Sequence, residues 1–280
     1  MAERPERRAP RARGAQVLRT ERITPHMVRV VLGGDGLADF ALDGYTDHYV
    51  KLCFAPEGAE YAHPFDVARI REEYPRELWP TTRTYTVRSW DAAARELAID
   101  FVVHGDEGLA GPWAAGAKPG DQVTFLGPGG GYAPEASADW HLLAGDESAL
   151  PAVAAALERM PAGAVVHAFV EVADAAEEQK IATPDGVAVT WLHRAGRPVG
   201  EALVEAVRGL EFPPGDVQAF VHGEAAFVKE IRRHLRLERG IPADRLSISG
   251  YWRLGHDDEA WRSVKREWNE QVQREQERAA

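Results

Sequence analysis

The sequence predicts two domains, an N-terminal antiparallel β-barrel followed by an α/β domain with a parallel sheet. Its 280 residues exceed the length of a typical single domain, and an apolar content of 45% is enough for two cores. The pattern also changes along the chain, from short apolar runs separated by turns to apolar runs that alternate with helical patterns. We place the boundary at residues 129–138, which gives a disordered basic tail over residues 1–14, a barrel over residues 15–134 and an α/β domain over residues 139–280.

Six short apolar runs in the first half are separated by turn-forming Gly and Pro residues, a spacing typical of a small antiparallel barrel. Between the third and the fourth run, residues 55–82 contain four prolines and many charges. This segment predicts a long excursion with one helical turn near residues 67–73. The predicted strands are residues 16–20, 27–32, 49–54, 84–90, 97–103 and 122–126.

In the second half, strand patterns alternate with helix patterns, which indicates a parallel sheet. A charged helix ends the chain and carries an apolar stripe. We expect this stripe (Trp261, Val264, Trp268 and Val272) to dock on the protein's own core, with a dimer contact as the alternative. The predicted strands are residues 140–144, 165–170, 187–192, 217–222 and 246–252, and the predicted helices before the last one are residues 148–159, 200–209 and 224–239.

Composition excludes several classes of function. A net charge of −11 argues against nonspecific nucleic-acid binding, although an acidic protein can still hold a local basic pocket for an anionic small molecule. Cys53 is the only cysteine, so the chain has no internal disulfide, multi-thiolate zinc site or iron–sulfur cluster. We expect Cys53 to be a buried core residue. The dispersed histidines predict no protein-held metal.

No apolar run is long enough to cross a membrane, so no membrane insertion is expected. The basic start of the chain, MAERPERRAPRARGA, lacks the apolar segment of an export signal. We therefore expect a cytoplasmic protein, and we expect it to be a monomer.

The run RTYTVRSWD, residues 83–91, carries more polar groups than an ordinary barrel strand. In a regular strand, Arg83 and Tyr85 share one face, whereas Thr86 and Arg88 share the other. A guanidinium pairs with phosphate, a tyrosine ring offers stacking area, and a threonine hydroxyl bonds a heteroatom. The run therefore fits a flavin nucleotide, while a strand with solvated charges is the alternative.

Two further glycine-containing loops bear on nucleotide binding. In HGDEGLAGPWA, residues 104–114, glycines and a helix starting near Pro112 favour an anion. In AGDESALPA, residues 144–152, Asp146 and Ser148 are suited to cap the following helix, and the spacing does not match a hydrolase nucleophile elbow. The run GPGGGY, residues 127–132, is not followed by a helix, so it predicts a turn and not a dinucleotide fingerprint.

These motifs, in this order, resemble the siderophore-interacting protein family, FAD-dependent ferric-siderophore reductases of the ferredoxin-reductase-like superfamily. The resemblance runs from Val17 to Trp261 and includes RTYTVR, HGDEGLAGPWAAGAKPGD, GPGGGY, AGDESALPA and YWRLGHDDEAW. It implies that the barrel binds FAD and that the α/β domain resembles an NAD(P)H-binding domain. Leu109 replaces the family's usual proline and Gly111 its usual hydroxyl residue, so backbone contacts from Ala110 and Gly111 are expected there.

The resemblance also implies particular site residues. Because Arg83 and Thr86 lie on opposite faces of an ideal strand, their joint contact with one ligand implies a strand end or a bulge between them. Arg88 receives no role. The implied cofactor-binding residues are Arg83, Tyr85, Thr86, His104, Gly108, Ala110, Gly111, Asp146, Ser148, Tyr251 and Trp252, and the implied substrate-binding residues are Lys51, Arg253 and Lys265.

The predicted function is the transfer of electrons from NADH, NADPH or a ferredoxin through FAD to the Fe(III) of a ferric siderophore, with no catalytic acid–base residue. The alternatives are a general flavin reductase and a siderophore-binding protein without enzyme activity. Glu171 ends a predicted strand, where an acid takes a ribose hydroxyl and favours NADH over NADPH. The siderophore class, the electron donor and the oligomeric state stay open.

Overall fold

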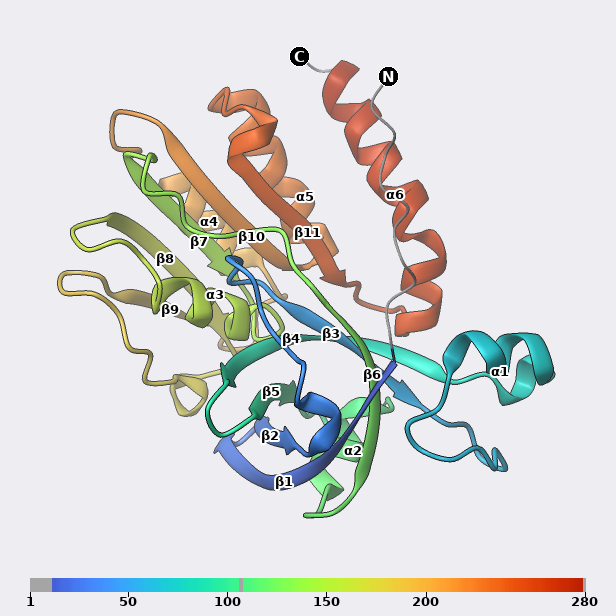
Figure 1. Ribbon diagram of the computed structural model, residues 1–280. Helices are drawn as coiled ribbons and strands as arrows, with labels where there is room; N and C mark the ends of the chain where they lie inside the picture. Colours follow the sequence, from blue (N-terminus) through green and yellow to red (C-terminus); the bar gives the residue numbers. More distant parts are fainter. Residues whose placement is uncertain (1–11, 106–107, 279–280) are drawn as a thin grey trace, which may run out of the picture.

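The computed structural model describes residues 12–105 and 108–278, arranged as a barrel packed beneath a sheet with helices (Figure 1). The first strand, β1 (Ala12–Thr24), already includes residues 12–14, so the tail prediction is wrong for these three residues. Residues 1–11, the rest of the predicted tail, lie outside the described residues.

The first domain is a closed barrel of six strands in the order β1-β2-β5-β4-β3-β6, and every neighbouring pair is antiparallel. Val30, Leu52 and Phe125 are among the buried side chains that fill its core. Cys53 is buried, as predicted, and burial raises the pKa of its thiol to about 11. The remaining elements are β2 (Met27–Gly33), β3 (Tyr49–Phe54), α1 (Val67–Glu73), β4 (Thr81–Asp91), β5 (Glu96–Val102), α2 (Ala110–Gly116) and β6 (Gln122–Gly129).

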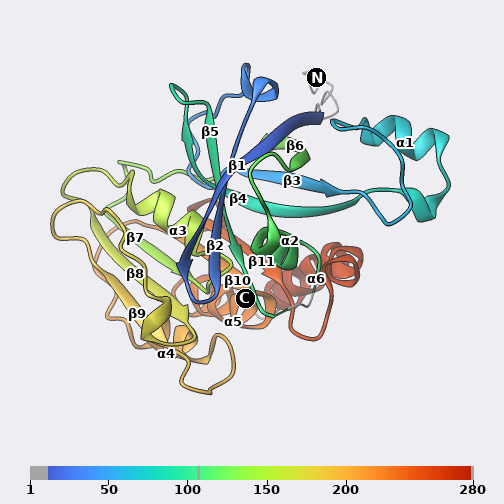
Figure 2. The ribbon, with the colours of Figure 1, turned by 90° about the horizontal axis from the view of Figure 1, so that it is seen from below.

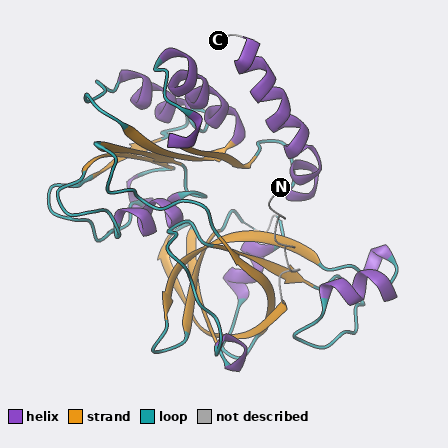
Figure 3. Cartoon of the chain, turned by 45° about the horizontal axis from the view of Figure 1, so that its top comes forward, coloured by secondary structure: helices purple, strands orange, loops and turns teal. Residues whose placement is uncertain are grey.

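The second domain is a parallel sheet of five strands in the order β11-β10-β7-β8-β9. Helix α3 packs against the barrel strand β4, whereas α4 and α5 cover the other face of the sheet (Figure 3). The predicted helix over residues 224–239 is α5 followed by a π-helical turn, His234–Glu238. The elements are β7 (Trp140–Gly145), α3 (Leu150–Leu157), β8 (Val165–Val172), β9 (Val189–His193), α4 (Glu201–Gly209), β10 (Val217–Glu224), α5 (Ala225–Arg233), β11 (Leu246–Trp252) and α6 (Asp258–Arg278).

Several polar contacts join the two domains, and two of them fix β4 and the β1–β2 hairpin. Arg88 of β4 donates two hydrogen bonds to Glu158, which follows α3, over 2.8 and 2.5 Å. At the tip of the β1–β2 hairpin, which Figure 2 shows reaching the second domain, Glu177 accepts from Thr24 over 2.5 Å and lies 2.6 Å from the His26 ring. These contacts hold β4 against the parallel sheet and give Arg88 a structural role.

The last helix, α6, starts beside β4 and extends along β11 (Figure 1). Trp261 anchors it: this side chain is 1% exposed and lies over Gly250, where a Cβ atom would come within 3.2 Å of the indole. Trp268 packs edge-on against Trp261, with ring centroids 5.4 Å apart. The prediction that the apolar stripe docks on the protein's own core is confirmed for Trp261.

Candidate functional site

Strand β4 presents an open edge where the two domains meet. It pairs with β3 without a register shift from Thr81 to Thr86, but with β5 only from Val87 to Asp91. The predicted strand end or bulge between Arg83 and Thr86 is therefore wrong, which counts against contact of both side chains with one ligand across a strand face, and the irregularity lies at Arg88, between Val87 and Ser89. Because no described strand pairs with the other edge of β4 before Val87, a ligand along that edge would meet side chains from both faces.

In the structure, the guanidinium of Arg83 is paired with a carboxylate of the same chain. Its guanidinium forms a bidentate ion pair with Glu259 of α6, in which Nη2 donates to Oε2 over 2.8 Å. One helical turn further on, Arg262 donates to the carbonyl and the hydroxyl of Thr82 over 2.6 and 2.8 Å. A guanidinium that holds a carboxylate in this way also fits a phosphate oxygen pair, so the residues at this edge fit the phosphates of FAD.

The two other residues of the motif face different surroundings. Tyr85 packs against Phe101 of the barrel core, with ring centroids 4.3 Å apart, so the core covers part of its ring. Thr86 is buried, and its side chain lies close enough to Tyr251 of β11 to influence the pKa of that phenol, which burial raises. The structure thus brings Thr86 and Tyr251, which are distant in sequence, to the same point between the domains.

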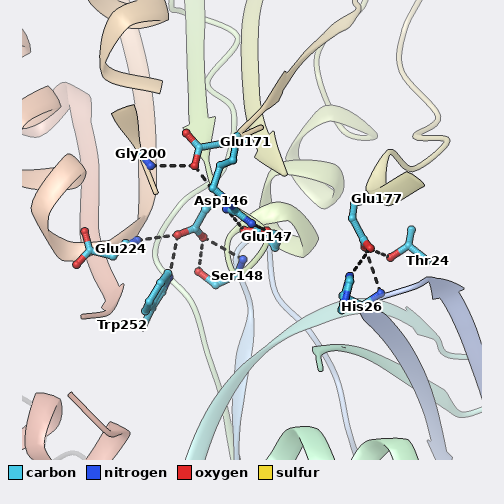
Figure 4. Close-up of polar contacts among 11 residues, drawn as sticks. Thr24, His26, Asp146, Glu147, Ser148, Glu171, Glu177, Gly200, Glu224 and Trp252 are labelled. Atoms are coloured by element: carbon cyan, nitrogen blue, oxygen red, sulfur yellow. Dashed lines mark hydrogen bonds and ion pairs between the residues drawn. The ribbon is translucent and has the colours of Figure 1, made fainter. Parts of the chain in front are cut away.

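Asp146 is not placed as a direct cofactor ligand, because its side chain is 0% exposed. Its carboxylate accepts from the Trp252 indole and from the backbone N–H of Glu224, each over 2.8 Å, and from the hydroxyl of Ser148 over 2.5 Å (Figure 4). Burial raises the pKa of Asp146 to about 6. Gly223 leaves room for this carboxylate, since a Cβ there would lie 2.7 Å from it. Asp146 therefore joins the ends of β7, β10 and β11 and orients Trp252.

The loop after β5 is only partly described, because residues 106–107 lie outside the described ranges. His104 stacks on His26, with ring centroids 6.4 Å apart, beside the contact to Glu177. Gly108 has a left-handed backbone and open space around it. Ala110 is buried, and a Cβ on Gly111 would lie 3.1 Å from the carbonyl oxygen of Val102. Close packing of α2 on β5 thus explains the glycine that stands where the family has a hydroxyl residue.

The three predicted substrate cations come from three elements. Lys51 of β3 is the cross-strand partner of Thr84, so it shares the outer face of the barrel with Thr86, two residues along β4. Arg253 follows β11 and lies over the Trp261 ring, 5.9 Å from its centroid. Lys265 of α6 is close enough to His222 for its charge to lower the pKa of that imidazole.

His222 is a residue of this region to which the sequence assigned no role. It stacks on Phe220, with ring centroids 3.9 Å apart, and contacts the Tyr251 ring at 4.9 Å. Burial, followed by the charge of Lys265, lowers its pKa to about 3, so the ring is neutral at physiological pH. Its place at the end of β10, before a glycine, was the available signal in the sequence.

Glu171 does not offer its carboxylate to a ribose. The side chain is 0% exposed, and Oε1 accepts from the backbone N–H of Gly200 over 2.8 Å and from Arg194 over 3.4 Å. The expectation that Glu171 binds a ribose hydroxyl and favours NADH is therefore wrong for this arrangement.

In the part of the chain that the structure describes, neither a metal-binding cluster nor a membrane-spanning helix accompanies these groups. Within residues 12–105 and 108–278, no cluster of three or more His, Cys, Asp or Glu side chains is placed to hold a metal ion. In the same part of the chain, no helix is long and apolar enough to cross a bilayer.

The closed six-stranded barrel joined to a parallel five-stranded sheet is the ferredoxin-reductase-like fold. A ferredoxin–NADP+ reductase from Plasmodium falciparum has this fold, with a TM-score of 0.63 at 9% identity, over 86% of this chain and 96% of that one. Residues 16–132 match the siderophore-interacting FAD-binding domain, and residues 138–255 match the siderophore-interacting protein domain. The chain belongs to the siderophore-interacting protein family.

Similar proteins include two bacterial reductases and one solved structure. Ferric vibriobactin reductase ViuB of Vibrio cholerae is 36% identical over 87% of this chain and 90% of its own length. The NADPH-dependent ferric-chelate reductase of Escherichia coli is 35% identical over 86% of this chain and 93% of its own length. The crystal structure of a siderophore utilization protein from T. fusca superposes with a TM-score of 0.77 at 42% identity, covering 90% of this chain and 97% of that one.

Proposed function

We propose that the protein is an FAD-dependent ferric-siderophore reductase. The observation that carries the proposal is the anion-binding Arg83 on the open edge of β4, at the point where the barrel meets the parallel sheet. The match of this barrel to the family's FAD-binding domain and the names of the two reductases support it.

In this proposal, the residues of the chain bind and orient the reactants. Arg83 would hold the FAD phosphates, Tyr85 and Thr86 would line the flavin, and Tyr251 and Trp252 would close the site from the second domain. The hydrogen bond from Trp252 to Asp146 would fix the position of that indole. His104, Gly108, Ala110, Gly111 and Ser148 stay predictions as neighbours of the cofactor.

Bound FAD would supply the redox chemistry, since it accepts two electrons from a donor and releases them singly, here to two ferric ions. Fe(II) is a softer and less charged ion that oxygen donors hold less well, so the chelate would release it. Lys51, Arg253 and Lys265 would attract the anionic ferric complex in an otherwise acidic protein. The protein's task is to hold the flavin and the chelate close together, which requires no acid–base residue.

The direct test is anaerobic reduction of the flavin-loaded protein by NADPH, NADH and reduced ferredoxin in parallel, followed by addition of a ferric siderophore and an Fe(II)-specific chelator. We expect bleaching of the flavin absorbance by a donor, its return when the siderophore is added, and colour from trapped Fe(II). Protein that binds no FAD contradicts the proposal and leaves a siderophore-binding role. Turnover of free flavin without iron reduction indicates a general flavin reductase.

Two finer features stay predictions. The cytoplasmic location is checked by cell fractionation, and the monomeric state by size-exclusion chromatography with light scattering. Ferredoxin is retained as a candidate donor, which the parallel reductions distinguish from the two nicotinamide nucleotides.

A further inference from the structure

The order of the strands determines how a nicotinamide dinucleotide would lie on the second domain. The domain meets β4 through Tyr251 of β11, and Asp146 of β7 holds the neighbouring Trp252. A nicotinamide that delivers a hydride to the flavin must therefore lie at the ends of β7, β10 and β11. Since ligands of parallel sheets lie across the carboxyl ends of the strands, the adenosine half would extend in the other direction, over β8 and β9.

At the carboxyl ends of β8 and β9, the structure presents a guanidinium. The backbone N–H of Arg194 donates to Val172 over 3.0 Å, which fixes this residue directly after β9 and beside the end of β8. The next residue, Ala195, has a left-handed backbone with φ of 50°, a conformation that costs energy for a residue with a Cβ. The turn thus holds Arg194 at the edge of the sheet.

Arg194 is held by carboxylates at this edge. It forms a bidentate pair with Glu147 of the loop after β7, in which Nη1 donates to Oε2 over 2.9 Å, and it also contacts the buried Glu171 (Figure 4 shows both acids). Glu171 also accepts a hydrogen bond from the backbone N–H of Gly200, and this bond does not depend on the partner of Arg194. A dianionic phosphate could therefore replace Glu147 on the guanidinium while Glu171 continues to orient it.

Two more basic side chains flank Arg194: His193 ends β9, and Arg197 lies beyond the turn. They are 39% and 38% exposed, and both contact glutamates at the surface. Exposed pairs of this kind contribute little to stability, so these side chains can turn toward another anion. In NAD-selective sites an acid at the ribose accepts the 2′-hydroxyl, whereas in NADP sites an arginine accommodates the 2′-phosphate. With Glu171 buried and a guanidinium at this edge, the residues present match the second arrangement.

We propose that Arg194 receives the 2′-phosphate of NADPH and makes NADPH, not NADH, the preferred donor. The inference rests on the proposed function for its biological meaning, but its binding step can be measured without iron or electron transfer. The specificity would arise from release of Arg194 by Glu147 and formation of an equivalent pair with the phosphate, with no covalent step.

The test compares binding of 2′-phospho-5′-AMP with that of 5′-AMP to the full chain, measured by isothermal titration calorimetry. In the unmodified protein we expect the 2′-phosphorylated nucleotide to bind about tenfold or more tightly, the difference expected for hydrogen bonds between charged groups. Arg194→Gln should remove this difference and leave 5′-AMP binding unchanged. Glu147→Gln should instead strengthen binding of the 2′-phosphorylated nucleotide by about twofold or more, because it removes the carboxylate that competes with the phosphate for Arg194.

Arg208→Gln is the matched control, since Arg208 pairs with Glu238 at 3.5 Å in the last turn of α4, away from the carboxyl edge. Equal binding of the two nucleotides, or an unchanged ratio in Arg194→Gln, overturns the inference while leaving the flavin site in place. Absence of bound FAD would instead contradict the proposed function. If Arg194→Gln does not fold, Glu147→Gln provides the test. A preference of this variant for the 2′-phosphorylated nucleotide over 5′-AMP that is no greater than that of the unmodified protein counts against Arg194.

Discussion

At the scale of single residues, the pair of Arg83 and Glu259 links the flavin site to the C-terminal helix. Glu259 lies 176 positions from Arg83 in sequence and binds the guanidinium that we assign to the FAD phosphates. Its side chain is 54% exposed, so the pair is worth at most about 1 kcal/mol. Glu259 would therefore compete with a phosphate without excluding it.

Substitution Glu259→Gln should tighten FAD binding. The change removes both the competing partner of Arg83 and a negative charge beside the phosphates, and we expect the Kd of flavin-free protein for FAD to fall by about two- to fivefold. Quenching of FAD fluorescence measures this Kd. Glu270→Gln serves as the control, because Glu270 pairs with Arg266 and Arg274 of the same helix. Weaker binding in Glu259→Gln would mean that Glu259 orients Arg83 for the phosphate instead of competing with it.

Asp146 should make stability depend on pH. Burial raises its pKa in the folded protein to about 6, above the usual value of about 3.8 expected in the unfolded chain. The folded state therefore binds this proton more tightly, and the contribution of Asp146 to stability falls as pH rises from about 4 to about 6. The shift corresponds to roughly 3 kcal/mol, as an order of magnitude.

This dependence is measured by denaturant unfolding of the native protein and of Asp146→Asn between pH 4.5 and 7.5, at equal FAD loading. As pH rises, the free energy of unfolding of the native protein should fall relative to that of Asp146→Asn. A difference that stays constant, or that moves the other way, would show that the hydrogen bonds to Asp146 keep its carboxylate ionised throughout.

At the scale of elements, β4 connects the barrel, α3 and α6. The sequence predicted this strand and its unusual polar content, but not the direction of each side chain. Periodicity predicts faces, whereas the open edge of β4 depends on where β5 ends, and the partner of Arg88 depends on the docking of α3. Such contacts join residues far apart in sequence, so no local pattern could have revealed them.

A double-mutant cycle on Arg88 and Glu158 tests the contact between β4 and α3. Arg88 is 11% exposed and Glu158 30%, so we expect a coupling free energy of about 1–2 kcal/mol in denaturant unfolding. Arg88→Ala alone should cost more than Glu158→Ala, because it also removes a charge near Asp100, whose side chain is 1% exposed. Additive effects would mean that the pair does not hold the domains together. The matched exposed pair Arg69 and Glu73 of α1 is the control, with an expected coupling below about 0.5 kcal/mol.

At the scale of the whole molecule, the two-domain architecture was predictable because strand and helix periodicities extend over long segments. All eleven predicted strands are present, with the six barrel strands before the five strands of the parallel sheet. The site was less predictable. The roles of Arg83, Thr86 and Tyr251 at the flavin stay predictions, whereas Asp146 and Glu171 are buried supports, because the sequence of a strand end does not reveal whether its carboxylate points outward.

The arrangement also explains how an acidic protein could handle an anionic chelate. Lys51, Arg253 and Lys265, which we propose as the contacts to the chelate, come from β3, the segment after β11, and α6, so only folding could bring them together. Flavin, donor and ferric complex would then meet between the barrel and the parallel sheet, with the protein's other carboxylates distributed over both domains.

The central claim is that electrons pass from a nicotinamide donor through bound FAD to chelated iron, and its most direct test is one stoichiometry. Under anaerobic conditions, with a ferric siderophore and an Fe(II)-specific chelator present, the amounts of NADPH oxidised and of Fe(II) trapped are measured together in flavin-loaded and flavin-free protein. The account predicts two Fe(II) for each NADPH with FAD bound and none without it. Oxidation of NADPH without trapped Fe(II), or equal iron reduction by the flavin-free protein, would contradict it.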